Sequence, residues 1–284
     1  MLTKKHIVHG TLFVIAGLLM LGSYITSWQD VGRETAAWGP LIALGLIVFG
    51  GGMLWKGEGA LSKQSLVIEY YDAIVMAVGI ALLVRTYVIE PFKIPSGSMI
   101  PTLLVGDYLF VNKMSYGHRI PFTRDRFMMG DGPARGDIAV FEFPENPDKD
   151  YIKRIVGLPG DRVVYEDKRL FINGKPIAYR PEGPYTYYNE RGQRVEAARL
   201  VEELGEQHHS ILVQPFSYTA DRFEQIVPPG HYFVLGDNRD NSNDSRFWGY
   251  VPAYRLLGRA VILFWSWDHL GSGVRWERLG SAVE

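Results

Sequence analysis

The 284-residue sequence contains no cysteine. This absence excludes disulfide bonds, thiolate nucleophiles and cysteine-ligated metal sites, so a nucleophile here would be a hydroxyl, an amine or a carboxylate. The sequence also lacks a G-x-S-x-G elbow and an H-E-x-x-H zinc motif, and its seven histidines are scattered. We therefore interpret the histidines as surface or core side chains, and expect no metal and no cofactor.

Neither sign of charge is in excess. Lys and Arg number 30 against 31 Asp and Glu, which gives a formal net charge of −1 at pH 7. Nucleic-acid binding proteins carry a basic stripe that neutralises phosphates. We therefore expect no nucleic-acid partner.

Long apolar runs are confined to the first third of the chain. The runs at about 7–28 and 38–55 are long enough to cross a bilayer. The run at about 66–89 spans only if Asp72 and Arg85 lie near opposite interfaces, and an interfacial helix is its alternative. A cleaved secretory signal is the other interpretation of the first run, but the run is too long for the apolar region of such a signal. We predict a membrane region at 1–89 with three transmembrane helices.

Basic residues predict the orientation of these helices. Lys4 and Lys5 precede the first run, and Lys56 and Lys63 follow the second. The positive-inside rule places these four lysines in the cytoplasm. Three crossings then leave residues 90–284 on the extracytoplasmic side.

Residues 90–284 contain short alternating segments separated by Asn-Gly and Pro-Gly turns, which is typical of antiparallel β-sheet. The stretches 180–190 and 195–207 look irregular or helical, and we interpret about 180–221 as an insertion. The predicted fold is thus N-terminal transmembrane helices followed by a mainly β extracytoplasmic domain of antiparallel sheets. Strands are predicted at 107–112, 137–143, 151–156, 162–165, 170–172 and 231–235.

The stretch 95–102, PSGSMIPT, follows closely on the third apolar run, so Ser98 is expected near the bilayer surface. Pro95 and Pro101 stiffen a turn, and Gly97 permits close approach of another backbone. Such a turn can display the Ser98 hydroxyl. The alternative is a simple linker between a membrane helix and a domain.

A serine nucleophile needs a base, and a lysine can serve after burial has lowered its pKa. Lys153 lies in a predicted strand, where alternation puts it on one face with Tyr151 and Ile155. These apolar neighbours favour desolvation of the amine. A solvated lysine on an edge strand is the alternative.

The polar stretch 236–246, GDNRDNSNDSR, directly follows a predicted strand. A calcium loop beginning at Asp240 is one interpretation, but Ser245 replaces the required glycine and Val251 the bidentate glutamate. The interleaved Asp and Arg instead favour a salt-bridged scaffold that fixes neighbouring strands.

Taken together, four ordered segments resemble the type I signal peptidases, membrane-bound serine proteases that remove signal peptides from exported proteins. They span most of residues 90–252, but the insertion at about 180–221 matches no motif, and the better-known Gram-negative members have two membrane segments rather than three. The segments are 90–103 (EPFKIPSGSMIPTL), 135–141 (RGDIAVF), 150–161 (DYIKRIVGLPGD), and 227–230 with 236–249 (VPPG and GDNRDNSNDSRFWG).

The resemblance implies a Ser/Lys dyad with Ser98 as nucleophile and Lys153 as general base. It implies that the Ser96 hydroxyl joins the Ser98 N–H in an oxyanion hole, and that Ser242 orients the lysine amine. It further implies a supporting scaffold of Asp237, Arg239, Asp244 and Arg246, with Arg154 structural.

The resemblance also implies the substrate and the location. An extended substrate would add a strand beside the segments of Ile94 and Tyr151, and cleavage would follow Ala-x-Ala. The implied partners are signal peptides of preproteins, the lipid bilayer and the export machinery, at the bacterial cytoplasmic (inner) membrane with the catalytic domain on the periplasmic side. The aromatic run 264–267 contacts lipid or packs in the core. The implied pocket for small side chains is lined by Phe92, Ile94, Val140 and Ile152.

Two other functions stay open at this stage. Self-cleaving repressors share the Ser/Lys mechanism, but the predicted spanning helices and the lack of a DNA-binding segment count against that class. A membrane-anchored β-domain could instead only bind signal peptides or secretion components. The presence of both Ser98 and Lys153 argues against a binding-only role.

Overall fold

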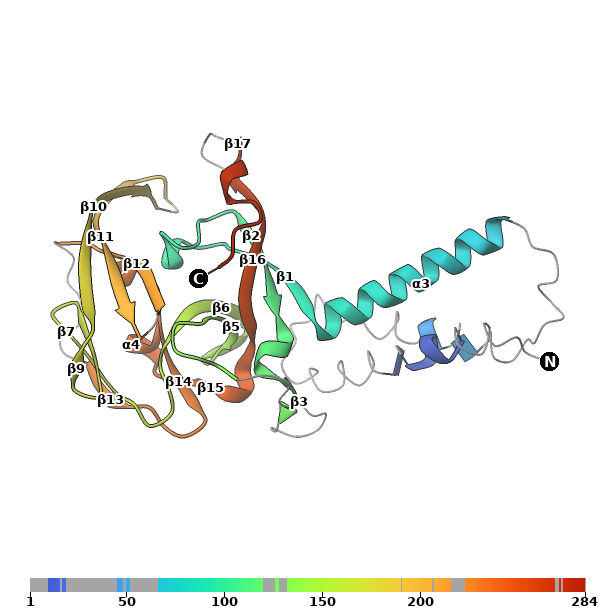
Figure 1. Cartoon of the computed structure of the whole chain (residues 1–284), viewed down its shortest axis with the longest axis horizontal. Helices are drawn as coiled ribbons and strands as arrows, with labels where there is room; N and C mark the ends of the chain where they lie inside the picture. The colour runs from blue at the N-terminus through green and yellow to red at the C-terminus, as the bar shows by residue number, and fades with distance from the viewer. Residues whose placement is uncertain are drawn as a thin grey trace. The chain divides into compact units, whose positions relative to one another are not determined.

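The chain separates into two compact units. One comprises Met1–Ile89 with Arg119–Asp125, and the other Glu90–His118 with Arg126–Glu284. The computed structural model, shown in Figure 1, describes residues 10–15, 17–18, 45–47, 50–51, 66–119, 126–127, 132–189, 191–205, 207–215, 223–268, 271 and 273–283.

Helix α3, Leu66–Tyr87, is the longest helix described in the first unit (Figure 1). It corresponds to the third predicted membrane segment, and several of its large apolar side chains, including Ile74 and Ile80, are exposed. No helix among the described residues is long and apolar enough to cross a membrane. The predicted segments at 7–28 and 38–55 lie largely outside the described residues.

The second unit is built on an eight-stranded sheet with the order β1-β2-β16-β5-β6-β14-β15, to which β17 adds by pairing with β16. Strands β5, β6, β14 and β16 pair antiparallel with their neighbours. The strands are β1 (Ile89–Lys93), β2 (Asp107–Asn112), β5 (Ile138–Phe143), β6 (Asn146–Gly157), β14 (His231–Leu235), β15 (Val251–Pro252), β16 (Leu256–Asp268) and β17 (Gly273–Val274).

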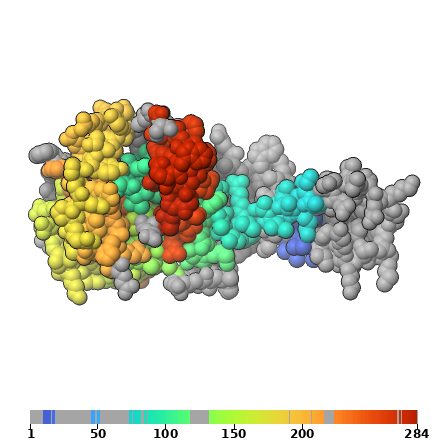
Figure 2. Space-filling model, turned by 45° about the horizontal axis from the view of Figure 1, so that its top comes forward, coloured from blue at the N-terminus to red at the C-terminus, as the bar shows by residue number. Residues whose placement is uncertain are grey.

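Three smaller sheets complete the described strands. The sheet β10-β11-β12 contains Ala178–Tyr188, Arg194–Leu204 and Gln207–Val213, and Figure 2 shows it in yellow and orange at the surface of the second unit. The sheet β13-β7-β8-β9 contains Phe223–Ile226, Arg162–Glu166, Arg169–Ile172 and Lys175–Pro176; β3 (His118–Arg119) pairs with β4 (Arg126–Phe127).

All six predicted strands are confirmed, as β2, β5, β6, β7, β8 and β14, with ends shifted by a residue or more in four of them. The mainly β, antiparallel character of the second unit is confirmed as well. The expectation that 180–190 and 195–207 are irregular or helical is wrong, because 180–188 belong to β10 and 195–204 to β11. The buried carboxylate of Glu202 on β11 interrupts the apolar and polar alternation by which a strand is recognised.

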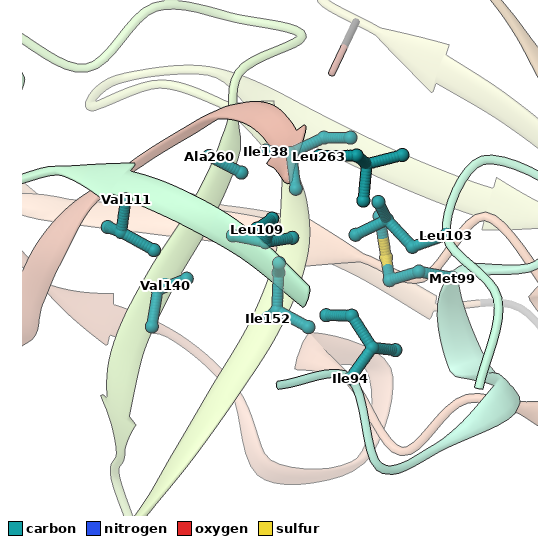
Figure 3. Close-up of a cluster of buried hydrophobic side chains, with 10 residues drawn as sticks. All are labelled: Ile94, Met99, Leu103, Leu109, Val111, Ile138, Val140, Ile152, Ala260 and Leu263. Carbon is teal, nitrogen blue, oxygen red and sulfur yellow. The ribbon is translucent and has the colours of Figure 1, made fainter. Parts of the chain in front are cut away.

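A buried apolar cluster supports the segment that carries Ser98 (Figure 3). Burial of a large apolar side chain contributes about 1.5–3 kcal/mol. Several such side chains therefore hold the backbone between Ile94 and Leu103 in place. The cluster consists of Ile94, Met99, Leu103, Leu109, Val111, Ile138, Val140, Ile152, Ala260 and Leu263.

Candidate functional site

Ser98 lies in a single turn of 3-10 helix, η2 (Gly97–Met99), in the loop between β1 and β2. We call residues 94–106 the Ser98 loop. Ile94 and Met99 are buried on either side of the serine, and the Ile94 N–H donates to the Asp107 carbonyl at 2.8 Å. The loop therefore has a fixed conformation, which excludes the simple linker.

Lys153 meets Ser98 from strand β6. Its Nζ lies 2.7 Å from Ser98 Oγ and donates to the Ile152 carbonyl at 2.9 Å. Strand β6 lies between β5 and β14, so Lys153 is on an internal strand, and only 4% of its surface is exposed. The structure therefore excludes the solvated, edge-strand alternative.

Burial lowers the pKa of Lys153 from 10.5 to about 8, although the carboxylates of Asp244 and Asp237 act in the opposite direction. The Tyr151 ring, 5.3 Å from Nζ, forms part of the amine's surroundings. A lysine with this pKa is neutral in an appreciable fraction of molecules near neutral pH. At 2.7 Å, the neutral amine can accept the proton of the Ser98 hydroxyl.

A cleft of about 460 Å³ opens onto this pair. Of the four predicted pocket residues, Phe92 and Ile152 line the cleft, and Ile94 and Val140 do not. Ile94 and Val140 are buried beside Ile152 in the apolar cluster. The full lining is Phe92, Pro95, Ser96, Ser98, Asp150, Tyr151, Ile152, Lys153, Asp240, Asn241, Ser242 and Asn243.

The two other predicted serines lie beside the same cleft. Ser96 Oγ is 3.4 Å from Ser98 Oγ. Ser242 is buried, and within the described part of the chain its hydroxyl has no hydrogen-bond partner, Lys153 included. An orienting role for Ser242 therefore stays a prediction.

A glycine brings the segment 236–246, here called the Asp-Arg loop, against Ser98. A Cβ at Gly236 would lie 2.3 Å from Ser242 Oγ and 2.5 Å from the Ser98 carbonyl oxygen. Any larger residue would separate these two segments.

The predicted ion-pair scaffold underlies this loop. Asp244 receives Arg246 Nε at 2.8 Å and Nη2 at 2.9 Å, and it also accepts the Gly236 N–H at 3.1 Å. Asp237 receives Arg154 Nε at 2.9 Å and Nη2 at 2.8 Å. Burial raises the pKa of Asp237, but Arg154, His209 and Thr102 together outweigh burial and hold that pKa below its usual value.

Asp240 and Asp244, the two carboxylates on which the calcium-loop interpretation depends, already have hydrogen-bond partners. Asp240 accepts Lys168 Nζ at 2.9 Å and the Gln214 N–H at 2.6 Å, and Asp244 is paired with Arg246. Within the described ranges, no group of three His, Asp or Glu side chains is arranged to hold a metal.

The segment at about 180–221, which we interpret as an insertion, contributes side chains that the sequence did not identify. Glu202 of β11 is fully buried and accepts Arg239 Nη2 at 2.5 Å, and His209 of β12 lies 3.0 Å from the same carboxylate. The Leu212 N–H donates to the Asp237 carbonyl at 2.8 Å. The Glu202–Arg239 and Leu212–Asp237 contacts join residues 37 and 25 positions apart, so no local motif could have revealed them.

Comparisons with known proteins show which family the chain belongs to. A family model described as signal peptidase, peptidase S26, matches residues 67–265. A signal peptidase I from Pseudomonas fluorescens is 44% identical over 219 residues, covering 73% of this chain and 75% of that protein. The Pseudomonas aeruginosa signal peptidase I is 41% identical over 219 residues, with the same two coverages.

More distant relatives carry the same name. The Aquifex aeolicus signal peptidase I is 37% identical over 214 residues, covering 65% of this chain and 79% of that protein. A crystal structure of a signal peptidase I from Enterococcus faecalis shares 30% identity, covers 45% of this chain and 97% of that chain, and aligns with a TM-score of 0.28. The family match and the identities of the Pseudomonas relatives decide the assignment: the chain belongs to the signal peptidase family, peptidase S26, and is a serine endopeptidase.

Proposed function

We propose that this enzyme removes N-terminal signal peptides from exported preproteins, with Ser98 as nucleophile and Lys153 as general base. The observation that carries the mechanism is the 2.7 Å separation of Lys153 Nζ and Ser98 Oγ in a cleft that both residues line. The lowered pKa of Lys153 supports its role as a base. The relatives named signal peptidase I support the choice of substrate.

In the first half of the reaction, the neutral amine of Lys153 accepts the Ser98 proton while Oγ attacks the carbonyl carbon of the scissile bond. The Ser98 N–H and the Ser96 hydroxyl stabilise the resulting oxyanion. The intermediate then collapses with cleavage of the C–N bond, and the Lys153 ammonium donates its proton to the departing amine. The mature protein leaves, and the signal peptide remains as an ester on Ser98.

In the second half, a water molecule attacks the ester carbonyl and gives a proton to Lys153. Cleavage of the ester releases the signal peptide as a carboxylic acid, and Lys153 returns the proton to Ser98 Oγ. The cycle needs no metal and no cofactor.

The cleft supports selection of small side chains at the cleavage site. Strand β1 lies at one end of the large sheet, so an extended substrate has an edge with which to pair. Phe92 and Ile152 form part of the cleft wall, and the buried Ile94 and Val140 close the space behind it. An apolar wall at this point of the cleft leaves room for small apolar side chains and supports cleavage after Ala-x-Ala.

We place the enzyme in the bacterial inner membrane, with residues 1–89 as a membrane region and 90–284 as a periplasmic catalytic domain that contains the insertion at about 180–221. The apolar runs at 7–28, 38–55 and 66–89 and the flanking lysines support this arrangement. Exposed Trp265, Trp267 and Trp276 on the catalytic domain support contact with the bilayer. The export machinery is the expected source of substrate.

The test is cleavage of a preprotein with an Ala-x-Ala junction by the full chain in lipid or detergent, with the product's N-terminus mapped. We expect one cut after the second alanine, lost in Ser98→Ala and Lys153→Ala proteins that remain folded. Binding of the preprotein by folded wild type without cleavage would instead support a binding-only module. Cleavage by either variant would overturn the dyad.

A further inference from the structure

Asn238, which precedes the short helix η4 (Arg239–Asn241), makes two hydrogen bonds to the Ser98 loop. Its backbone N–H donates to the Ser98 carbonyl at 3.0 Å, and its side-chain Nδ2 donates to the Gly97 carbonyl at 3.0 Å. A carbonyl oxygen only accepts, so the amide nitrogen must face Gly97. Asn238 is fully buried, and water cannot replace either bond.

The Gly97 carbonyl belongs to the same peptide unit as the Ser98 N–H. A peptide unit is planar, and in the trans form its C=O and N–H point in opposite directions. A donor fixed on the Gly97 oxygen therefore fixes the direction of the Ser98 N–H. It also polarises that peptide, which makes the N–H a stronger donor.

The second hydrogen of Asn238 Nδ2 is held by the insertion. Nδ2 donates to the Tyr187 hydroxyl at 2.9 Å, and Tyr187 lies on β10. The Tyr187 ring is buried in a cluster with Ile100, Ala197 and Leu212, which sets the position of its hydroxyl. With both hydrogens used, the Asn238 amide has one orientation.

We propose that Asn238, held by Tyr187, is a positioning residue that aims the Ser98 N–H at the oxyanion. This rests on the proposed function, in which that N–H is an oxyanion-hole donor. The insertion thereby acts on the chemistry through the chain Tyr187, Asn238, Gly97. Loss of an entire oxyanion donor lowers kcat by about 10²–10³-fold, so a misdirected donor should lower it by about 10- to 100-fold.

The test compares full-length Asn238→Leu with wild type on a signal-peptide substrate in detergent. Leucine keeps the approximate shape and adds no charge, and the backbone bond to the Ser98 carbonyl remains. We expect kcat to fall by about 10- to 100-fold with KM changed less than about twofold, because an oxyanion hole acts in the transition state. A peptide aldehyde that forms a tetrahedral adduct with Ser98 should bind more weakly by a similar factor.

Tyr187→Phe should lower kcat in the same direction by a smaller factor. If Tyr187 acts only through Asn238, the double variant should be no slower than Asn238→Leu alone. The matched controls are Tyr188→Phe, the exposed neighbour of Tyr187, and Asn189→Asp in the β10–β11 turn, and both should retain wild-type kcat. If thermal unfolding shows that Asn238→Leu is not folded, the comparison of Tyr187→Phe with its control Tyr188→Phe decides the question.

Three results would overturn the proposal while the enzyme remains a signal peptidase. The first is a wild-type kcat in the folded variants, and the second is additive losses of kcat in the double variant. The third is a shift in the pH midpoint of kcat, which would mean that Asn238 acts on Lys153. Wild type that does not cleave the substrate would reject the proposed function itself, and the positioning role with it.

Discussion

The Lys153 amine is almost completely buried, and burial lowers its pKa to about 8. Its protonation state therefore changes with pH around that value. In the proposed mechanism, only the neutral amine accepts the Ser98 proton. We predict that kcat/KM rises about tenfold per pH unit below pH 8 and levels off above a midpoint of about 8. The measurement is the pH dependence of cleavage of a peptide without titratable groups. A midpoint near 6.5 would point to a histidine base instead.

The same burial has a cost in stability. Because the folded-state pKa of Lys153, about 8, lies below the unfolded value of 10.5, the unfolded chain binds more protons between these values. The destabilisation of the folded state by the buried Lys153 ammonium is therefore complete below pH 8 and disappears as the pH rises towards 10.5. We predict that Lys153→Met abolishes cleavage and increases the free energy of unfolding at pH 7 by on the order of 1–3 kcal/mol.

Chemical denaturation of the two proteins at pH 7 and pH 10 checks this prediction. The gain should shrink at the higher pH. The same substitution at the exposed Lys149 serves as the control, because an exposed ammonium has little desolvation to recover. Equal or lower stability of Lys153→Met at pH 7 would show that the amine's hydrogen bonds outweigh its desolvation.

The residues of the candidate site differ in how far the sequence could predict them. Ser98 and Lys153 stand in local patterns, a proline-flanked turn and an alternating strand, and the structure brings their reactive atoms within 2.7 Å. Asn238 lies in a recognisable polar loop, but its partner Tyr187 is 51 positions away. The strand that contains Tyr187 is rich in tyrosine, and its sequence does not indicate which hydroxyl contacts the buried Asn238 amide.

At the scale of elements, strand β11 is joined to the Asp-Arg loop by the buried charge pair of Glu202 and Arg239. Burial raises the pKa of Glu202, but Arg239 and His209 outweigh burial and hold that pKa well below its usual value. Removing one partner of a buried pair leaves an uncompensated charge, which costs about 3–5 kcal/mol. We predict a loss of about that size in the free energy of unfolding for Glu202→Gln.

The neighbouring Glu203 provides a matched control for this prediction. It pairs with Arg180 at 2.8 Å on the surface, where an ion pair contributes about 0–1 kcal/mol. Chemical denaturation should therefore separate Glu202→Gln from Glu203→Gln by at least about 2 kcal/mol. Equal effects of the two substitutions would mean that the buried pair contributes no more than a surface pair.

The strands differ in predictability for a related reason. Strands β2 and β14 have the predicted ends, because burial alternates along β2, and turn residues at Gly230 and Gly236 bound the apolar run of β14. Strand β11 breaks the alternation at Glu202, whose burial depends on Arg239 from a distant loop. A strand is therefore difficult to predict where a polar side chain is buried on its inward face and the partner of that side chain is distant in the sequence.

At the scale of the whole molecule, the division at Ile89 and Glu90 separates the membrane region of our proposal from a unit with its own cores. Among the described residues, the four clusters of buried apolar side chains all lie between Ile94 and Leu263, and so do Ser98, Lys153 and the Asp-Arg loop. We predict that a fragment of residues 90–284 folds and cleaves a short soluble peptide with a kcat within about threefold of the full chain.

The fragment should nevertheless process a preprotein embedded in vesicles more slowly than the full chain. Anchoring enzyme and substrate in one bilayer raises their effective concentration, an advantage commonly worth 10²–10⁴-fold in avidity. The measurement compares the full chain and the fragment on the soluble peptide and on the vesicle-bound preprotein. A loss confined to the vesicle-bound substrate would assign residues 1–89 to presentation of the substrate. A comparable loss on the soluble peptide would show that those residues also support the conformation of the cleft.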